Sequence, residues 1–571
     1  MPFSPLFLRS ALAAVALMMV AAPPAPAADV AGPYLAARLA TTQNDYAAAR
    51  EYYDLLLLAT PEDRNVQEGA LITHIALADT DKVTALTQII LAEKQPSQIA
   101  VLAVLAEAAK AGDFARGVAL LDSDAAEGSN LVSGLFRAWA MVGQGQMAEA
   151  GKAFDKLGKG QGLAGFAAYH KALSLAMVGD YEGSEKIFSG DMAQILHTTR
   201  RAILAHVQVL SQLERDQDAV KLLDDAFGPA LDPELSAVRA SLERGDVVPF
   251  NIARTASDGV AETFYTVAQA LNSEGPTAFS LVHARLALMV RPDFGDAVLL
   301  TAAILEGQEQ NDLAIAAYEQ VKPDNPIYPA TELGRAEALV AADRGADAIV
   351  ALEKLSQAHP ELPSVWIALG DNYRRVERYG DSAAAYDKAI AQIAAPGPRD
   401  WFVFFARGIA EHKSDQWDKA EKDFRQALTL SPDQPSVLNY LGYSYVERRQ
   451  NLDEALNMIQ RAVDARPDAG YIIDSLGWAY YMLGRYDDAV VEMEKAVALE
   501  PTEPLLNDHL GDVYWAVGRK REAEFQWHRA LNLGSGEDLD MDRVRRKLDL
   551  GLDTVLQQEG APALLPVHAA D

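Results

Sequence analysis

Apolar and small residues repeat along the carboxy-terminal part of the chain with a period of about 34 residues. Leu-Gly pairs stand at 441/442, 476/477 and 510/511, so successive units lie 35 and then 34 residues apart. An aromatic residue follows each glycine by three positions: Tyr445, Tyr480 and Tyr514. Alanines recur further along each unit: Ala455, Ala489 and Ala523, then Ala462, Ala496 and Ala530. Pro467 and Pro501 close the first two units.

These residue types are typical of a helix-turn-helix unit. Gly or Ala is needed where two helices cross closely, and large apolar residues fill the space to the next pair. Proline ends the second helix because it cannot donate the backbone hydrogen bond that would continue it. The order Leu-Gly-x-x-Tyr, Ala, a bulky residue, Ala and Pro closely resembles the tetratricopeptide-repeat (TPR) family. The resemblance implies an all-α TPR solenoid, a superhelical array of stacked helix pairs.

The same frame extends towards the amino terminus. Further units are expected to start near residues 261, 295, 329, 363 and 401, and a weaker set near 30, 65, 98, 131, 165 and 200. Together with the three carboxy-terminal units they make fourteen candidate repeats, eight clear and six degenerate. A fixed phase over so many steps predicts one extended array rather than a single compact core.

Breaks in the phase suggest the domain organisation, which has five parts. We expect a signal peptide at 1–27, a degenerate TPR block of about six repeats at 28–230, a linking helix and extended connector at 231–260, a TPR block of about eight repeats at 261–534, and a capping helix with a mobile tail at 535–571. The connector is rich in β-branched and turn residues, and we interpret it as a segment that lies across the solenoid.

The first residues are typical of a secretory signal peptide. Arg9 precedes an apolar run at 11–22, and Ala25-Pro26-Ala27 is a small-x-small cleavage site. An uncleaved anchor is the alternative interpretation, and no later stretch is apolar enough to span a membrane. We therefore expect an exported bacterial protein in the periplasm, with peripheral membrane association left open.

Composition removes several classes of function. The chain has no cysteine, which excludes disulfides, cysteine-ligated metals, cysteine nucleophiles and a lipid-modified cysteine. The formal net charge is −30, and removal of the one arginine in the signal segment makes it −31. Phosphate-rich partners are repelled by such a surface, so nucleic acid is excluded and basic or neutral polypeptides are favoured.

The sequence contains only partial matches to catalytic or cofactor-binding motifs. The run GQGLAG at 160–165 lacks the preceding strand that a dinucleotide site needs. The closest two histidines, His197 and His206, are nine residues apart, which does not place two metal ligands on one helical face. Ser475, Asp508 and His509 form a Ser-His-Asp set only formally, because neighbouring helices lie roughly 9–10 Å apart. We expect no enzyme activity, no cofactor and no metal site.

The first helix of each unit predicts a peptide-binding groove. Its positions 2, 5, 9 and 12 share one side, and stacking of the repeats aligns these sides into a concave surface. The groove residues that we predict are Asn439, Tyr443, Asp474, Trp478, Tyr481, Asp508, Asp512 and Trp515. Rings supply contact area, while the amide and carboxylates would take backbone N–H or Lys and Arg groups. The alternative is that some rings only fill space between repeats.

The run from LNYLGYSYVERRQNLDEA to LNDHLGDVYWAVGRKREAEFQWHRAL is more specific than a generic TPR. It resembles large secreted proteobacterial TPR proteins, including the adaptor lipoprotein (LbcA-like) of a periplasmic carboxy-terminal processing protease. The resemblance implies a scaffold that grips an envelope protease with some repeats and a client, such as a cell-wall hydrolase, with others. The family adaptor is lipidated on cysteine, whereas this chain has none.

Two functions follow as hypotheses, with a catalytic solenoid as a remote third. The first is a non-catalytic periplasmic scaffold or adaptor that presents clients to an envelope protease. The alternative is an assembly factor for secreted polysaccharide, pili or outer-membrane components, whose partners would be export components.

Overall fold

The structure is a computed structural model that describes residues 30–92, 97–123, 130–228, 231–393, 395–534 and 539–565. The chain is 76% helical, and the described residues contain no strand. The expected signal peptide and the last residues of the expected tail lie outside the described residues. None of the described helices is both long and apolar enough to cross a membrane. The all-α fold class is confirmed.

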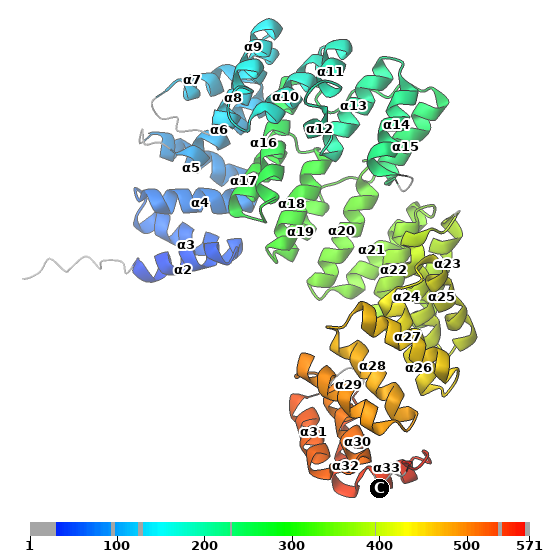
Figure 1. Cartoon of the computed structure of the whole chain (residues 1–571). Helices are drawn as coiled ribbons and strands as arrows, with labels where there is room; N and C mark the ends of the chain where they lie inside the picture. Colours follow the sequence, from blue (N-terminus) through cyan, green and yellow to red (C-terminus); the bar gives the residue numbers. More distant parts are fainter. Residues whose placement is uncertain are drawn as a thin grey trace, which may run out of the picture. The chain divides into compact units, whose positions relative to one another are not determined.

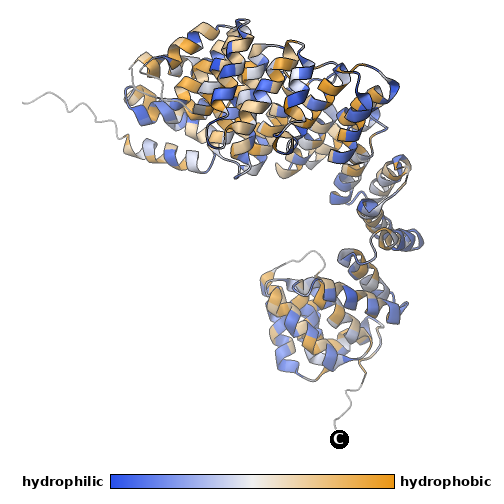
Figure 2. Cartoon of the chain, turned by 45° about the horizontal axis from the view of Figure 1, so that its top comes forward, coloured by the Kyte–Doolittle hydropathy of each residue, from blue (hydrophilic) through white to orange (hydrophobic). Residues whose placement is uncertain are grey.

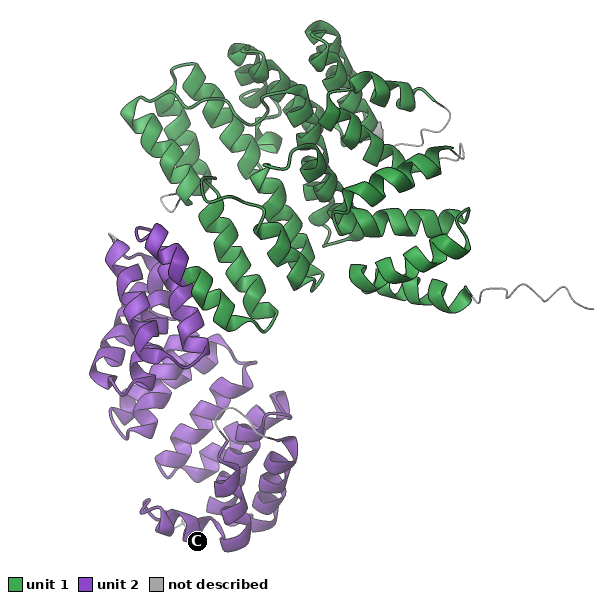
Figure 3. Ribbon diagram, turned by 180° about the vertical axis from the view of Figure 1, so that it is seen from behind, with its two compact units in different colours: residues 1–352 green, residues 353–571 purple. Residues whose placement is uncertain are grey.

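The chain divides into two compact units, residues 1–352 and 353–571 (Figure 3). The helices of unit 1 are α2 (Ala31–Thr42), α3 (Tyr46–Ala59), α4 (Arg64–Ala76), α5 (Thr80–Ala92), α6 (Gln98–Ala111), α7 (Phe114–Leu121), α8 (Asn130–Gly143), α9 (Met147–Leu157), α10 (Ala164–Met177), α11 (Tyr181–Phe188), α12 (Ala193–Leu196), α13 (Arg200–Gln212), α14 (Asp216–Phe227), α15 (Pro233–Arg244), α16 (Ala256–Asn272), α17 (Ala278–Val290), α18 (Gly295–Gly307), α19 (Asn311–Tyr318) and α20 (Tyr328–Ala341). The boundary between the units falls within α21 (Gly345–Ala358).

Unit 2 continues the series of helices. They are α22 (Pro363–Arg375), α23 (Tyr379–Gln392), the 3₁₀ turn η1 (Pro398–Asp400), α24 (Trp401–Lys413), α25 (Trp417–Leu430), α26 (Pro435–Glu447), α27 (Leu452–Ala465), α28 (Gly470–Met482), α29 (Tyr486–Leu499), α30 (Pro504–Ala516), α31 (Lys520–Leu533), α32 (Met541–Leu550) and α33 (Leu552–Gln558). Figure 2 shows apolar and polar residues side by side along the helices of both units, as amphipathic elements require.

The sequence period predicted where the helices begin. The starts expected at 98, 200, 295, 363 and 401 are the first residues of α6, α13, α18, α22 and α24. The small residues in the first helix of a pair also lie where the two helices cross closely, as the sequence predicted. A Cβ atom on Gly511 would lie 2.4 Å from Nε1 of the buried Trp527, and one on Gly370 would lie 2.7 Å from the Tyr386 ring. Glycine at these positions lets the ring of the second helix pack against the backbone of the first.

In unit 1, the chain covers the inner face of its own repeats. Helix α16 packs against α6, α8 and α10, and α17 packs against α4 and α6 (Figure 1). Each of these partners is the first helix of a pair, the position whose exposed side would otherwise form the groove. Gly259 of α16 lies directly against the buried ring of Trp139 in α8. The inner side of these repeats in unit 1 is therefore covered by the chain itself and does not form an open groove.

The connector before α16 also lies along a first helix. After α15 the backbone is neither helix nor strand from Asp246 to Thr255, and it runs beside α13 until α16 begins. The amide of Asn251 donates to Oε1 of Gln208 at 2.9 Å, and the amide of Val248 donates to Oγ of Ser211 at 3.0 Å. Ile252 is buried, with 1% of its surface exposed. The segment thus occupies the inner side of α13, and α16 starts at Ala256, within the range expected to be connector.

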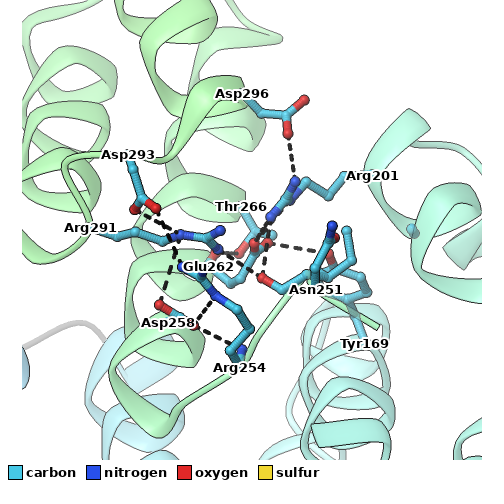
Figure 4. Close-up of polar contacts among 12 residues, drawn as sticks. Tyr169, Arg201, Asn251, Arg254, Asp258, Glu262, Thr266, Arg291, Asp293 and Asp296 are labelled. Carbon is cyan, nitrogen blue, oxygen red and sulfur yellow. Dashed lines mark hydrogen bonds and ion pairs between the residues drawn. The ribbon is translucent and has the colours of Figure 1, made fainter. Parts of the chain in front are cut away.

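A buried ionic cluster joins α13 to α16 and α18 (Figure 4). Arg201 of α13 pairs with Glu262 of α16 and with Asp296 of α18. Its guanidinium also donates to the carbonyl of Ile252 at 3.3 Å, and the hydroxyl of Tyr169 donates to Glu262 at the same distance. Burial raises the pKa of Glu262, while Arg201 opposes this change. The cluster holds the connector and three helices together with its charges compensated.

Candidate functional site

A cavity of about 660 Å³ lies along the first helices of unit 2, between α24, α26, α28, α30 and the start of α32. It contains five of the eight groove residues that the sequence predicts: Asn439, Tyr443, Asp474, Trp478 and Asp508. Tyr481, Asp512 and Trp515 are not part of its lining. The volume lies within the range of roughly 300–1,000 Å³ that is usual for ligand sites.

Aromatic rings form one wall of the cavity. The half-buried Trp478 is stacked between two rings, with its centroid 4.7 Å from Tyr481 and 4.1 Å from His509. The interplanar angles are 18° and 17°, so the three rings are nearly parallel. Tyr481 is buried behind Trp478, with 8% of its surface exposed. The indole is therefore held rigidly by its two neighbours, and only the part that they leave uncovered reaches the cavity.

Asp474 and His509 form a buried pair across adjacent repeats. Nδ1 of His509 lies 2.9 Å from Oδ2 of Asp474. Burial alone would lower the pKa of His509, but the carboxylates of Asp474, Asp508 and Asp512 together outweigh it and raise this pKa above the usual value. Ser475 instead donates to the carbonyl of Tyr471 at 3.1 Å. Sequence reasoning missed this pair, because helix spacing alone suggested that neighbouring side chains would not meet.

Asp508 and Asp512 bind a cation from the chain itself. Nζ of Lys547 in α32 lies 2.8 Å from Asp508 and 2.6 Å from Asp512, and the lysine is fully buried. Burial raises the pKa of Asp508, and Lys547 opposes the effect. Arg543 lies 3.5 Å from Asp512 as well, so these two carboxylates, expected to receive Lys or Arg groups of a partner, already have cations from the chain itself. The sequence did contain a signal for this contact: Arg543 and Lys547 are basic and lie one helical turn apart in the expected capping helix.

The cap also covers Trp515. Nε1 of Trp515 donates to Asp553 of α33 at 3.0 Å, and Gly551 lies against the ring. Nζ of Lys520 lies 4.5 Å from the centroid of the Trp515 ring. Trp515 therefore supports the cap rather than the cavity, which agrees with the alternative interpretation that some predicted groove rings fill space.

Asn439 contributes an acceptor that the described part of the chain leaves unused. Its Oδ1 is buried and has no hydrogen-bond partner among the described residues, although the side chain lines the cavity. An unpaired buried amide oxygen costs about 1–3 kcal/mol, a cost that a donor from a bound molecule would remove. Charges of both signs surround the cavity, with Lys413 and Arg543 against Glu447 and Asp540.

The other candidate chemistry from the sequence can be located within the described part of the chain. No group of three or more His, Cys, Asp or Glu residues in the described ranges could hold a metal ion. His197 and His206 do meet, with Nε2 of the first 2.9 Å from Nδ1 of the second. The GQGLAG run is a turn followed by the start of α10.

Comparison with known proteins gives the class. Residues 405–470 and 472–503 match models of the tetratricopeptide repeat. Together with the stacked helix pairs, these matches define a TPR solenoid, and a protein of this class carries protein-binding repeats.

Two curated relatives show the extent of the similarity. The TPR repeat-containing protein PA4667 of Pseudomonas aeruginosa is 30% identical over 186 residues, which are 33% of this chain and 31% of that protein. Cellulose synthase operon protein C of Xanthomonas axonopodis pv. citri is 26% identical over 178 residues, which are 27% of this chain and 12% of that protein. The chain thus spans less than a third of either relative's length in alignment.

Solved structures resemble the chain only loosely. The crystal structure of the APC/C hetero-tetramer Cut9-Hcn1 aligns with 92% of this chain and 96% of its own, at 14% identity and a TM-score of 0.38. A TPR protein from Parabacteroides merdae covers 45% of this chain and aligns over 98% of its own, with the same identity and score. Likeness of this degree says nothing about partners.

Proposed function

We propose that the chain is a non-catalytic scaffold that grips polypeptides in the cavity of unit 2. The observation that carries the proposal is the unused Oδ1 of Asn439 in a cavity walled by Trp478. A turn of the Asn439 side chain would bring this oxygen to a backbone N–H of a bound segment, and an apolar side chain of the segment would contact the uncovered edge of the Trp478 ring.

The charges favour an internal segment of mixed or neutral character. Asp508 and Asp512 are already paired with Lys547, so a strongly basic ligand gains little from them. Lys413 and Glu447 both line the cavity and carry opposite charges, so one of them repels a highly charged ligand of either sign.

The setting that we propose is the periplasm, reached through the signal peptide at 1–27, where the chain acts as an adaptor for an envelope protease. Support comes from the signal pattern and from the resemblance of the carboxy-terminal repeats to secreted proteobacterial TPR proteins. The second candidate is an assembly factor for secreted polysaccharide, pili or outer-membrane components, and the similarity to cellulose synthase operon protein C favours it.

The groove is tested by Trp478→Ala and Asn439→Ala in the full chain. Random peptides displayed on phage and selected on the wild-type protein supply the ligands, and their affinity is measured by calorimetry. Each substitution is expected to weaken binding roughly tenfold or more, because each removes a central contact. Val491→Ala on the exposed side of α29 is the control and should bind as the wild type does.

Circular dichroism accompanies these measurements. Helix content should stay near wild type in both variants, and a collapse for Trp478→Ala would show that this ring is core and not groove. Affinity capture from envelope extracts then separates the two settings: a processing protease with wall hydrolases supports the adaptor, and export components support the assembly factor. Either set of partners must be lost in Trp478→Ala.

A further inference from the structure

Unit 1 contains a second cavity, of about 430 Å³, that belongs to a different set of elements. Its walls come from α10, from the short insert helix α12, from the start of α13 and from the last turns of α16. The rings of Phe166, Tyr169 and Tyr265 and the aliphatic side chains of Ile195 and Leu196 line it. The lining is therefore mostly apolar, unlike that of the cavity in unit 2.

The charge inside this cavity is fully compensated. Arg201 is the one charged residue among the lining residues. It pairs with Glu262 and Asp296 and donates to the carbonyl of Ile252 (Figure 4). The remaining polar groups at the walls are neutral hydroxyls and one amide. A charged ligand would find no counter-ion here, so the cavity selects an uncharged, apolar occupant.

The neighbouring inner surface shows what kind of segment it accepts. Helices α16 and α17, rich in apolar residues, cover the first helices from α4 to α10. The cavity continues that covered surface beside the end of α16, where Ala270 and Ser273 form its edge. At the other edge the side chain of Ile195 is 56% exposed. An apolar polypeptide segment would continue the packing that the chain already makes with itself.

We propose that this cavity binds an uncharged apolar segment of a partner polypeptide, through a few aliphatic or aromatic side chains. The volume lies in the range of roughly 300–1,000 Å³ that accommodates small ligands but no folded domain. A fatty acid or an anionic lipid would bring a negative charge, and Arg201, the one cation among the lining residues, is already paired with Glu262 and Asp296. An internal polypeptide segment with apolar side chains carries no charge of its own, so it fits the apolar lining and needs no counter-ion.

The test measures how the full-length protein binds a neutral fluorescent probe, N-phenyl-1-naphthylamine, before and after the cavity is filled by a larger side chain. Ala270→Trp and Ala164→Trp replace exposed alanines at the edge of the cavity, so neither change disturbs the core. Bound-probe fluorescence is expected to fall roughly fivefold or more, since the indole occupies the probe's place. Ala148→Trp on the exposed side of α9 is the matched control and should bind the probe as the wild type does.

Competition identifies the occupant. An acetylated and amidated Ser-Leu-Phe-Leu-Ser peptide should displace the probe, whereas the same peptide with Asp in place of Phe should not. Equal binding of the probe by wild type and both filled variants would overturn the proposal. Displacement by laurate with no displacement by the apolar peptide would overturn the choice of a polypeptide.

Discussion

At the scale of single residues, the carboxylates predicted to face a partner turn out to be used internally. Asp508 and Asp512 share the buried Lys547, and Asp474 pairs with His509. Two carboxylates side by side repel each other unless a cation compensates them, so the lysine is a condition of folding for the last repeats. What remains for a ligand is the neutral chemistry of Asn439 and Trp478.

Removal of the Lys547 ammonium should strongly destabilise unit 2. Lys547→Ala leaves the buried Asp508 without its cation and Asp512 with only Arg543 at 3.5 Å, and we expect a loss of about 3–5 kcal/mol in the free energy of unfolding. Urea denaturation followed by tryptophan fluorescence measures it. Arg545→Ala, on the exposed side of the same helix, should change stability by less than about 0.5 kcal/mol. Equal stability of Lys547→Ala and wild type would contradict the role of this pair.

The raised pKa of Glu411 predicts that the stability of the protein depends on pH. Burial, followed by the nearby Asp423, raises the pKa of Glu411 to about 7. The unfolded glutamate ionises near pH 4.5, so stability falls as the pH rises from about 4.5 to 7 and stays low above that. Glu411→Gln should remove this penalty of about 1–3 kcal/mol at pH 8 and have little effect at pH 4.5. Urea midpoints at both pH values provide the measurement, with the exposed Glu524→Gln as control.

At the scale of elements, the connector 246–255 is bound like a ligand. Gln208 of α13 accepts from the Asn251 amide and donates from Nε2 to Oδ1 of Asn251, both at 2.9 Å. Gln212 donates to the carbonyl of Val248 at 2.7 Å. Amide side chains on the inner side of a repeat thus hold a non-helical backbone segment of the chain itself. The same chemistry is what we propose for Asn439 in unit 2.

Gln208→Ala should loosen the connector without unfolding α13. It removes two hydrogen bonds and leaves the Asn251 amide without its acceptor, at a cost of about 1–3 kcal/mol. Hydrogen exchange at this amide should therefore accelerate about 10- to 100-fold. Gln217→Ala, on the exposed side of α14, should leave the rate unchanged. Unchanged exchange in Gln208→Ala would mean that apolar burial at Ile252 alone holds the segment.

At the scale of the whole molecule, each unit has its own hydrophobic core. One continuous cluster runs from Ala37 to Ile327, and a second runs from Phe404 to Leu552. Repeats interact mainly with their neighbours, so a local defect spreads through its own core before it reaches another. Two units with separate cores are expected to unfold in separable steps.

Trp139→Ala tests this independence. The ring is fully buried between α8 and α16 and donates to Nδ1 of His170 at 3.1 Å, so its loss should cost about 3–5 kcal/mol. Hydrogen exchange with mass spectrometry in rising urea should show earlier opening of α6–α17. Exchange in α26–α31 should match the wild type, and earlier opening of both regions together would contradict separate units.

Much of the fold followed from the sequence alone. A helix start can be inferred locally, because proline, small residues and apolar spacing act through the backbone of the same segment. The first residues of α22 and α24 and the close approach at Gly511 were predictable on that basis. The candidate site was predictable in part: Asn439, Tyr443 and Trp478 line the cavity as the repeat frame indicated.

Tertiary structure decided which inner faces stay open. An apolar pattern marks residues for burial but does not name the surface that buries them, so the packing of α16 and α17 on the earlier repeats was not foreseeable. Lys547 meets Asp508 only because the chain turns back after α31. Local forces act within one helix and can be read along the chain, whereas the pairing of distant charges and faces depends on how the helices stack in three dimensions.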